Sequence, residues 1–205
     1  MDDRIIISIG RQYGSGGREI GKRLAEMFNI GFYDKELITL AARESGFSEE
    51  ILKENDENHN GSFLYSLVMG TYTGGDNLPL NHKLFLAQFD TIKKLASEKS
   101  CVIIGRCADY ALEYNPNCLK VFVHADIDSR IKRAIDEYGV SPDKVEDVIK
   151  KTDKKRESYY NFYTGKKWGL MQNYDLTINS SFSGIDGAVA AIADVVRARY
   201  KSVKM

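Results

Sequence analysis

The chain has 205 residues, enough for one domain with a sizeable core, and its 29 lysines and arginines equal its 29 aspartates and glutamates. This balance gives no overall attraction to nucleic acid or to an anionic membrane surface, so we expect neither as a partner. Local basic clusters must then carry any anion binding. No apolar stretch has the length needed to cross a bilayer, and the first residues lack the pattern of a secretory signal.

The three cysteines, Cys101, Cys107 and Cys118, are an odd number, and two of them fall in or near predicted buried strands. Cys101 and Cys107 are separated by five residues with no histidine nearby, which is a poor zinc signature, so no metal site is assigned. We expect reduced thiols in the core of a cytoplasmic protein.

Apolar and β-branched runs predict strands at residues 4–9, 31–33, 101–104, 119–124 and 175–178. Segments with apolar residues at helical spacing lie between them, at residues 18–28, 35–45, 81–99, 129–138, 142–160 and 185–200. Alternating strands and helices predict an α/β fold with a doubly wound parallel five-stranded sheet. Ligands of such sheets bind at the carboxyl ends of the strands.

Two segments interrupt this alternation. Residues 47–80 are first polar and then apolar, and their apolar stretch 63–72 could pack on the core or form a homodimer contact. Residues 150–169 gather basic side chains around tyrosines, which indicates either a solvated helix face or a lid that closes over phosphates. We predict one domain with a core of 1–34, 100–149 and 170–205, a helical insertion at about 35–99 and a lid at about 150–169.

The first strand runs into the glycine-rich stretch Gly14-Ser15-Gly16-Gly17, after which a helix begins. Strand, glycine loop and helix form a phosphate cradle, because glycines let backbone N–H groups turn inward and the helix N-terminus adds partial positive charge. A plain structural turn is the alternative, which the position at the first strand disfavours. The standard motif G-x-x-x-x-G-K-[ST] has a lysine where this chain has Gly17, and here the loop is one residue longer.

Further stretches, taken with this loop, resemble the cytidylate kinase-like family, a branch of the P-loop nucleoside monophosphate kinases. They are residues 8–20, 32–38, 102–106, 120–125, 153–156, 159–160, 163–165 and 174–179. The resemblance covers nearly the whole chain. It implies a P-loop NTPase fold of the nucleoside monophosphate kinase type, with a helical acceptor-binding insertion and a lid.

The loop and the resemblance together imply site residues. ATP phosphates and base would be bound by Arg11, Tyr13, Gly14, Ser15, Gly16, Gly17, Arg18, Glu19 and Asn179. The acceptor would be bound by Asp34 and Arg106, and the lid cations would be Arg130, Arg133, Lys154 and Arg156. Catalysis would fall to Arg18, Arg106, Arg156 and Asp153. Helix capping is an equal alternative for Asp34, and it is also an alternative for Glu19.

The chain departs from the family pattern at the residues that handle charge. Ile104 and Cys107 stand where cytidylate kinases have the two acids of a D-G-R-D motif, and Gly17 stands at the lysine position. Both lysine and acid stabilise charge that develops during phosphoryl transfer. Arg18, in the first helical turn, is the first candidate to replace the lysine, and Arg11 is the second.

The leading hypothesis is an ATP-dependent, Mg²⁺-requiring phosphotransferase that acts on a small molecule. A nucleoside monophosphate is the default acceptor, and only the resemblance favours CMP or dCMP. The alternative is a nucleotide-binding sensor or regulatory protein with weak or no catalysis. The loss of the lysine and of the two acids is what such a protein would show. Arg106 and the lid cations favour the kinase, because a sensor has no need of both. A purely structural protein ranks third.

Overall fold

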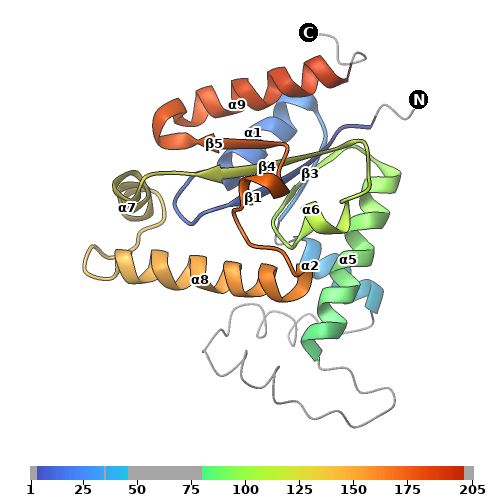
Figure 1. Cartoon of the computed structure of the whole chain (residues 1–205), viewed down its shortest axis with the longest axis horizontal. Coiled ribbons are helices and arrows are strands. Elements are labelled where there is room, and N and C mark those ends of the chain that lie inside the picture. The colour runs from blue at the N-terminus through green and yellow to red at the C-terminus, as the bar shows by residue number, and fades with distance from the viewer. Residues whose placement is uncertain (1–3, 35, 46–79, 201–205) are drawn as a thin grey trace.

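The computed structural model describes residues 4–34, 36–45 and 80–200 (Figure 1). Within these ranges five strands form one parallel sheet in the order β2-β3-β1-β4-β5. The strands are β1 (Ile6–Arg11), β2 (Gly31–Tyr33), β3 (Cys101–Ile104), β4 (Cys118–His124) and β5 (Leu176–Asn179). The predicted α/β fold with a five-stranded parallel sheet is confirmed.

Helices cover both faces of this sheet (Figure 1). They are α1 (Gly17–Phe28), α2 (Glu36–Ser45), α5 (Leu80–Glu98), α6 (Ala108–Ala111), α7 (Ile127–Asp136), α8 (Val145–Thr164), the 3-10 helix η1 (Met171–Asn173) and α9 (Ser180–Arg199). One apolar core lies between the sheet and the pair α1 and α9. A second core lies between the opposite face and helices α2, α5 and α6.

The central strand β1 joins the two cores, because its side chains alternate between the faces of the sheet. Ile7 and Ile9 face the core under α1 and α9, while Ile6 faces the other core. β1 continues to Arg11, past the predicted end at residue 9, because Gly10 and Arg11 remain paired with β4. This extension brings Arg11 to the carboxyl edge of the sheet.

Several helix bounds differ from the predicted ones. Helix α6 has four residues, too few for a hydrophobic period, and was not predicted. Helix α8 continues to Thr164, so most of the segment predicted as a lid is one continuous helix. The apolar segment 63–72, with its suggested homodimer contact, lies outside the described residues. In the described part of the chain, no helix is long and apolar enough to span a membrane.

All three cysteines are unpaired and buried, with exposed fractions of 0% for Cys101, 4% for Cys107 and 3% for Cys118. Burial raises the pKa of Cys101 to about 12 and that of Cys118 to about 11, so the reactive thiolates are scarce at neutral pH. We therefore expect iodoacetamide at pH 8 to leave the native protein unmodified and to alkylate all three thiols in urea, as intact-mass spectrometry would show. Fast alkylation of the native protein would contradict this burial.

Candidate functional site

The loop between β1 and α1 turns on two glycines with left-handed backbone, Gly14 (φ 79°) and Gly16 (φ 76°). Helix α1 begins directly afterwards at Gly17, and no side chain of the described residues caps its N-terminus. The first N–H groups of a helix have no partner within the helix, and they attract an anion in front of it. The loop therefore has the geometry of a phosphate-binding loop.

The interior of the loop is fixed by contacts with α9 and with the residue that follows β4. Ser15 is buried, and its hydroxyl donates to the carbonyl of Gln12 at 2.9 Å rather than facing outward. The hydroxyl of Ser180 donates to the Ser15 carbonyl at 2.7 Å, and the Gln12 side chain accepts the Ala125 N–H at 3.1 Å. Gln12 was not among the predicted site residues, and no sequence pattern marked it.

Arg130 of α7 and Asp153 of α8 hold the other side of the loop. The Asp153 carboxylate accepts the Tyr13 N–H at 2.7 Å, and the Arg130 guanidinium donates to the Tyr13 carbonyl, also at 2.7 Å. Arg130 and Asp153 form an ion pair with each other, and their side chains are only 8% and 16% exposed. These two residues thus position the backbone at Tyr13 in this structure, and we name them the Arg130–Asp153 clamp.

Arginine side chains gather around Asp34, which follows β2 and is 9% exposed. Arg18 donates from Nε to the Asp34 carboxylate at 2.6 Å, and its guanidinium lies 5.7 Å from the centre of the Phe32 ring. Arg11 lies 4.0 Å from the other carboxylate oxygen of Asp34. Asp34 is therefore a shared partner of two cations from either end of the glycine loop.

Two further arginines complete this group, which we call the arginine cluster (Arg11, Arg18, Arg106 and Arg156). Arg156 of α8 donates to the backbone carbonyl of Arg11 at 3.0 Å. Burial and the charges of Arg156, Arg106 and Arg18 lower the pKa of Arg11 to about 9, against the opposing effect of Asp34. Arg11 still carries its charge at neutral pH. Two carboxylates, Asp34 and Asp153 (3.8 Å from Arg156), face these four arginines, so positive charge is in excess and a bound anion would relieve it.

Arg106 sits in a strained turn directly after β3. Gly105, Arg106 and Cys107 all have left-handed backbone, with φ of 69°, 56° and 55°. Residues with side chains rarely adopt this conformation, and such strain gathers at functional sites. The Gly105 N–H donates to the Ile9 carbonyl at 3.0 Å, which ties the turn to β1 beside the glycine loop.

The other predicted site residues lie outside the arginine cluster. Glu19 forms ion pairs with Arg23 at 2.7 Å and with Arg133 at 2.8 Å. Asn179 accepts a backbone N–H at the start of α9 and so caps that helix. Lys154 is exposed on α8. The structure thus brings together the arginines from four separate segments and leaves these residues at its edge.

An aromatic cluster beside the site was not among the predicted site residues. Phe85 of α5 stacks on Tyr163 of α8 with ring centres 4.0 Å apart, and both pack near Cys107, the neighbour of Arg106. The hydroxyl of Tyr159 donates to the side chain of Gln88 at 3.2 Å. A four-residue spacing of aromatic residues on both helices was the available signal, since residues at this spacing share one helix face.

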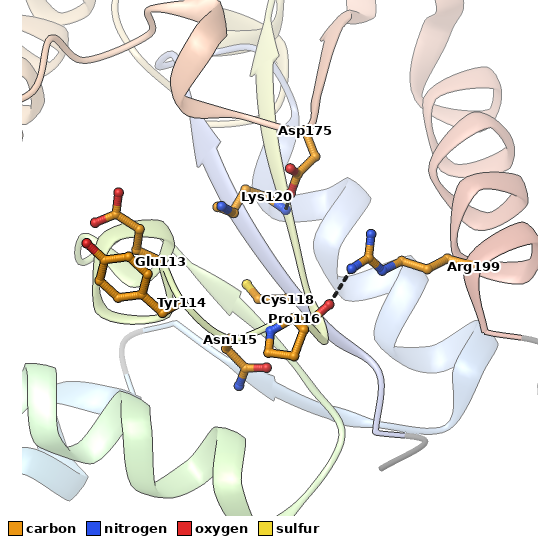
Figure 2. Close-up of a pocket in the computed structure, with 8 residues that line it drawn as sticks. All are labelled: Glu113, Tyr114, Asn115, Pro116, Cys118, Lys120, Asp175 and Arg199. Atoms are coloured by element: carbon orange, nitrogen blue, oxygen red, sulfur yellow. Dashed lines mark hydrogen bonds between the residues drawn. The ribbon is translucent and has the colours of Figure 1, made fainter. Parts of the chain in front are cut away.

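A separate pocket lies at the opposite end of the sheet, where β4 begins (Figure 2). Its lining residues are Glu113, Tyr114, Asn115, Pro116, Cys118, Lys120, Asp175 and Arg199. The Asp175 carboxylate accepts the Lys120 N–H at 2.8 Å, and Arg199 donates to the Pro116 carbonyl. None of these residues belongs to the glycine loop or the arginine cluster, so this pocket is not the candidate phosphate site.

The comparisons with known proteins agree with the fold. A crystal structure of an uncharacterized protein from Eubacterium ventriosum is 33% identical, with a TM-score of 0.71 over 95% of this chain and 99% of that one. Shikimate kinase from Bacteroides thetaiotaomicron is 16% identical, with a TM-score of 0.55 over 94% of this chain and 98% of that one. Shikimate kinase from Acinetobacter baumannii, in complex with shikimate, is 12% identical, with a TM-score of 0.51 over 98% of this chain and 96% of that one.

The two shikimate kinases share the fold of the chain, and a search of curated proteins found no match. The sequence matches the cytidylate kinase-like family over residues 6–182, and the chain therefore belongs to this family.

Proposed function

We propose that this protein transfers the γ-phosphoryl group of ATP to an anionic small molecule, with a nucleoside monophosphate as the default acceptor. Membership in a kinase-like family supports phosphotransfer in general. The observation that carries the proposal is the arginine cluster, which borders a glycine loop whose helix N-terminus is uncapped among the described residues. One part would bind the donor phosphates and the other the acceptor anion.

Electrostatics explain why these two parts suit phosphoryl transfer. Donor and acceptor both bring negative charge, and the reaction depends mainly on positioning them and neutralising that charge. Guanidinium groups bind two phosphate oxygens at once and stay charged at neutral pH. Arg106, held in the strained turn after β3, is the residue we assign to the acceptor phosphate, and Arg156 of α8 is the lid cation nearest to Arg11.

Magnesium would enter with ATP as part of the substrate. The described residues contain no group of three or more histidines, cysteines, aspartates or glutamates that could hold a metal. Mg²⁺ in kinases often keeps several waters and relies on the substrate phosphates for its ligands. Asp34, Glu19 and Asp153 are carboxylates near the loop, and all three are paired with arginines. We therefore assign no protein ligand to the metal.

The sensor remains a second candidate function, because Gly17 stands where the standard loop has lysine. The test is turnover of ATP, with Mg²⁺, across a panel of nucleoside monophosphates that includes CMP and dCMP, together with thermal shifts by ATP and ADP. A ligand at 100 times its Kd stabilises a protein by about 2.7 kcal/mol, so binding is readily detected. Turnover with one acceptor supports the kinase, and binding without turnover supports the sensor. If the protein shows neither turnover nor binding, both functions are excluded.

For the kinase, Arg106→Ala is expected to raise the acceptor KM about tenfold to a hundredfold, the loss of a charged hydrogen bond, while the ATP KM changes little. Initial-rate kinetics with each substrate varied in turn would measure both constants. Arg197→Ala is the matched control, because Arg197 lies on α9 and pairs with Asp194 at 3.1 Å. An unchanged acceptor KM for Arg106→Ala would assign Arg106 to the structure of the turn alone.

A further inference from the structure

Gly17 has no conformational reason to be glycine. It is the first residue of α1, and its φ is not among the positive values found at Gly14 and Gly16. The reason is contact: a Cβ atom at position 17 would lie 2.6 Å from the Cβ of Arg11 and 3.2 Å from its Cγ. Rotation of a side chain does not move a Cβ atom, so a separation this short could be relieved only by a shift of the backbone. With the backbone as it is, position 17 must be glycine as long as position 11 carries a side chain.

The far end of Arg11 meets a second glycine. A Cβ atom at Gly105 would collide with the Nη1 atom of Arg11. The side chain therefore starts beside Gly17, crosses the end of the glycine loop, and places its guanidinium against the strained turn that carries Arg106. This path begins where the side chain of a lysine at position 17 would begin, because a Cβ atom there would overlap the Cβ of Arg11.

Arg18, the nearest cation along the loop, is placed differently. Its Nε is bound to Asp34 at 2.6 Å, its guanidinium lies against Phe32, and its side chain is 55% exposed. The side chain of Arg11 is 21% exposed and sits 4.0 Å from Asp34, a weaker contact. Arg11 is thus the more enclosed of the two cations and the less fully neutralised. Both properties strengthen the electrostatic attraction between Arg11 and a phosphate.

We infer that Arg11 takes the place of the missing loop lysine. The cation then comes from the end of β1 and not from the first turn of α1. Glycine is required at position 17 because it leaves room for the side chain at position 11. The inference rests on the proposed function and names the residue that would contact the transferred group. In the reaction the bond between the γ-phosphorus and the bridging oxygen breaks, and a bond from the acceptor oxygen to that phosphorus forms. Arg11 stays protonated and donates N–H bonds to the phosphoryl oxygens.

The test begins with Arg11→Met, which removes the charge and keeps most of the volume. We expect kcat to fall about a hundredfold or more, with ATP affinity changed less, because the charge acts mainly in the transition state. Arg11→Lys should recover part of the loss. Arg18→Ala should lower kcat by less than about tenfold, and Arg197→Met should leave it unchanged. A smaller loss for Arg11→Met than for Arg18→Ala would overturn the inference in favour of Arg18.

The decisive variant moves the cation from position 11 to position 17. Arg11→Gly removes the colliding side chain, and the pair Arg11→Gly with Gly17→Lys places a lysine at the position where the standard motif has one. We expect this double variant to regain at least about tenfold in kcat over Arg11→Gly, whereas Gly17→Lys alone, which collides with Arg11, should lose stability and activity. Circular dichroism verifies that each variant folds. If the double variant folds but regains no activity, the inference that Arg11 replaces the loop lysine is overturned.

Failure of the proposed function would look different. If the parent turns over no acceptor, the thermal shift by ATP compared with ADP replaces kcat as the measurement. Arg11→Met should then lose the additional stabilisation that ATP gives over ADP, while the shift by ADP persists. Equal losses for both nucleotides, or no loss, would overturn the role of Arg11 whatever the protein does.

Discussion

Replacing Asp153 with alanine is expected to lower the free energy of unfolding by about 3 kcal/mol, the cost of leaving a buried charge without its partner. Arg130 is 8% exposed and would lose its only carboxylate among the described ion pairs. The Tyr13 N–H, which donates to Asp153 at 2.7 Å, would lose its acceptor as well. Because Arg130 also holds the Tyr13 carbonyl, the glycine loop should loosen together with the clamp.

Urea unfolding measures this loss, and two further variants separate its parts. Asp153→Asn retains an oxygen for the Tyr13 N–H but not the charge, so it should be intermediate. Asp147→Ala, on the same helix, removes a carboxylate that pairs with Lys151 at 3.9 Å while both side chains are about three-quarters exposed. That control should cost less than about 0.5 kcal/mol, as surface pairs contribute little. A cost for Asp153→Ala as small as this would show that the clamp does not hold the loop.

The sheet and the glycine loop could be predicted because their signals are local. Unbroken apolar runs such as residues 101–104 mark strands covered on both faces, and glycines between a strand and a helix mark the loop. The ends of the strands and helices were harder to predict. β1 gained Arg11 through pairing with β4, a contact that no pattern within residues 4–11 contains.

The contacts of the site could not be predicted in the same way. Tyr13 and Asp153 are 140 residues apart, and nothing in a basic helix tells which of its carboxylates accepts a particular backbone N–H. The resemblance singled out Asp153, and only the structure shows it on the loop backbone. Gly17 is a similar case, because the absence of lysine is visible in the sequence whereas the path of Arg11 across that position is not.

The loop glycines give a prediction in which strain and collision can be told apart. Gly14 has φ of 79°, and a Cβ atom there would lie 2.7 Å from the carbonyl oxygen of Arg130 and 3.0 Å from its Cα. Those atoms belong to the backbone of α7 and cannot rotate aside. Gly14→Ala is therefore expected to cost about 1 kcal/mol for the left-handed backbone and about 1–3 kcal/mol more for overpacking.

Gly139→Ala is the matched control, since Gly139 has φ of 66° and a Cβ atom there would meet nothing within 4 Å. It should show the backbone cost alone in urea unfolding and leave the thermal shift by ATP intact. Gly14→Ala should also abolish that shift, because the loop must part from α7 to admit the methyl group, and its N–H groups would then turn away from the phosphates. Equal costs for the two variants, with ATP binding retained in both, would mean that the loop is free to move away from Arg130. The clamp would then be a consequence of the fold and not the support of the glycine loop.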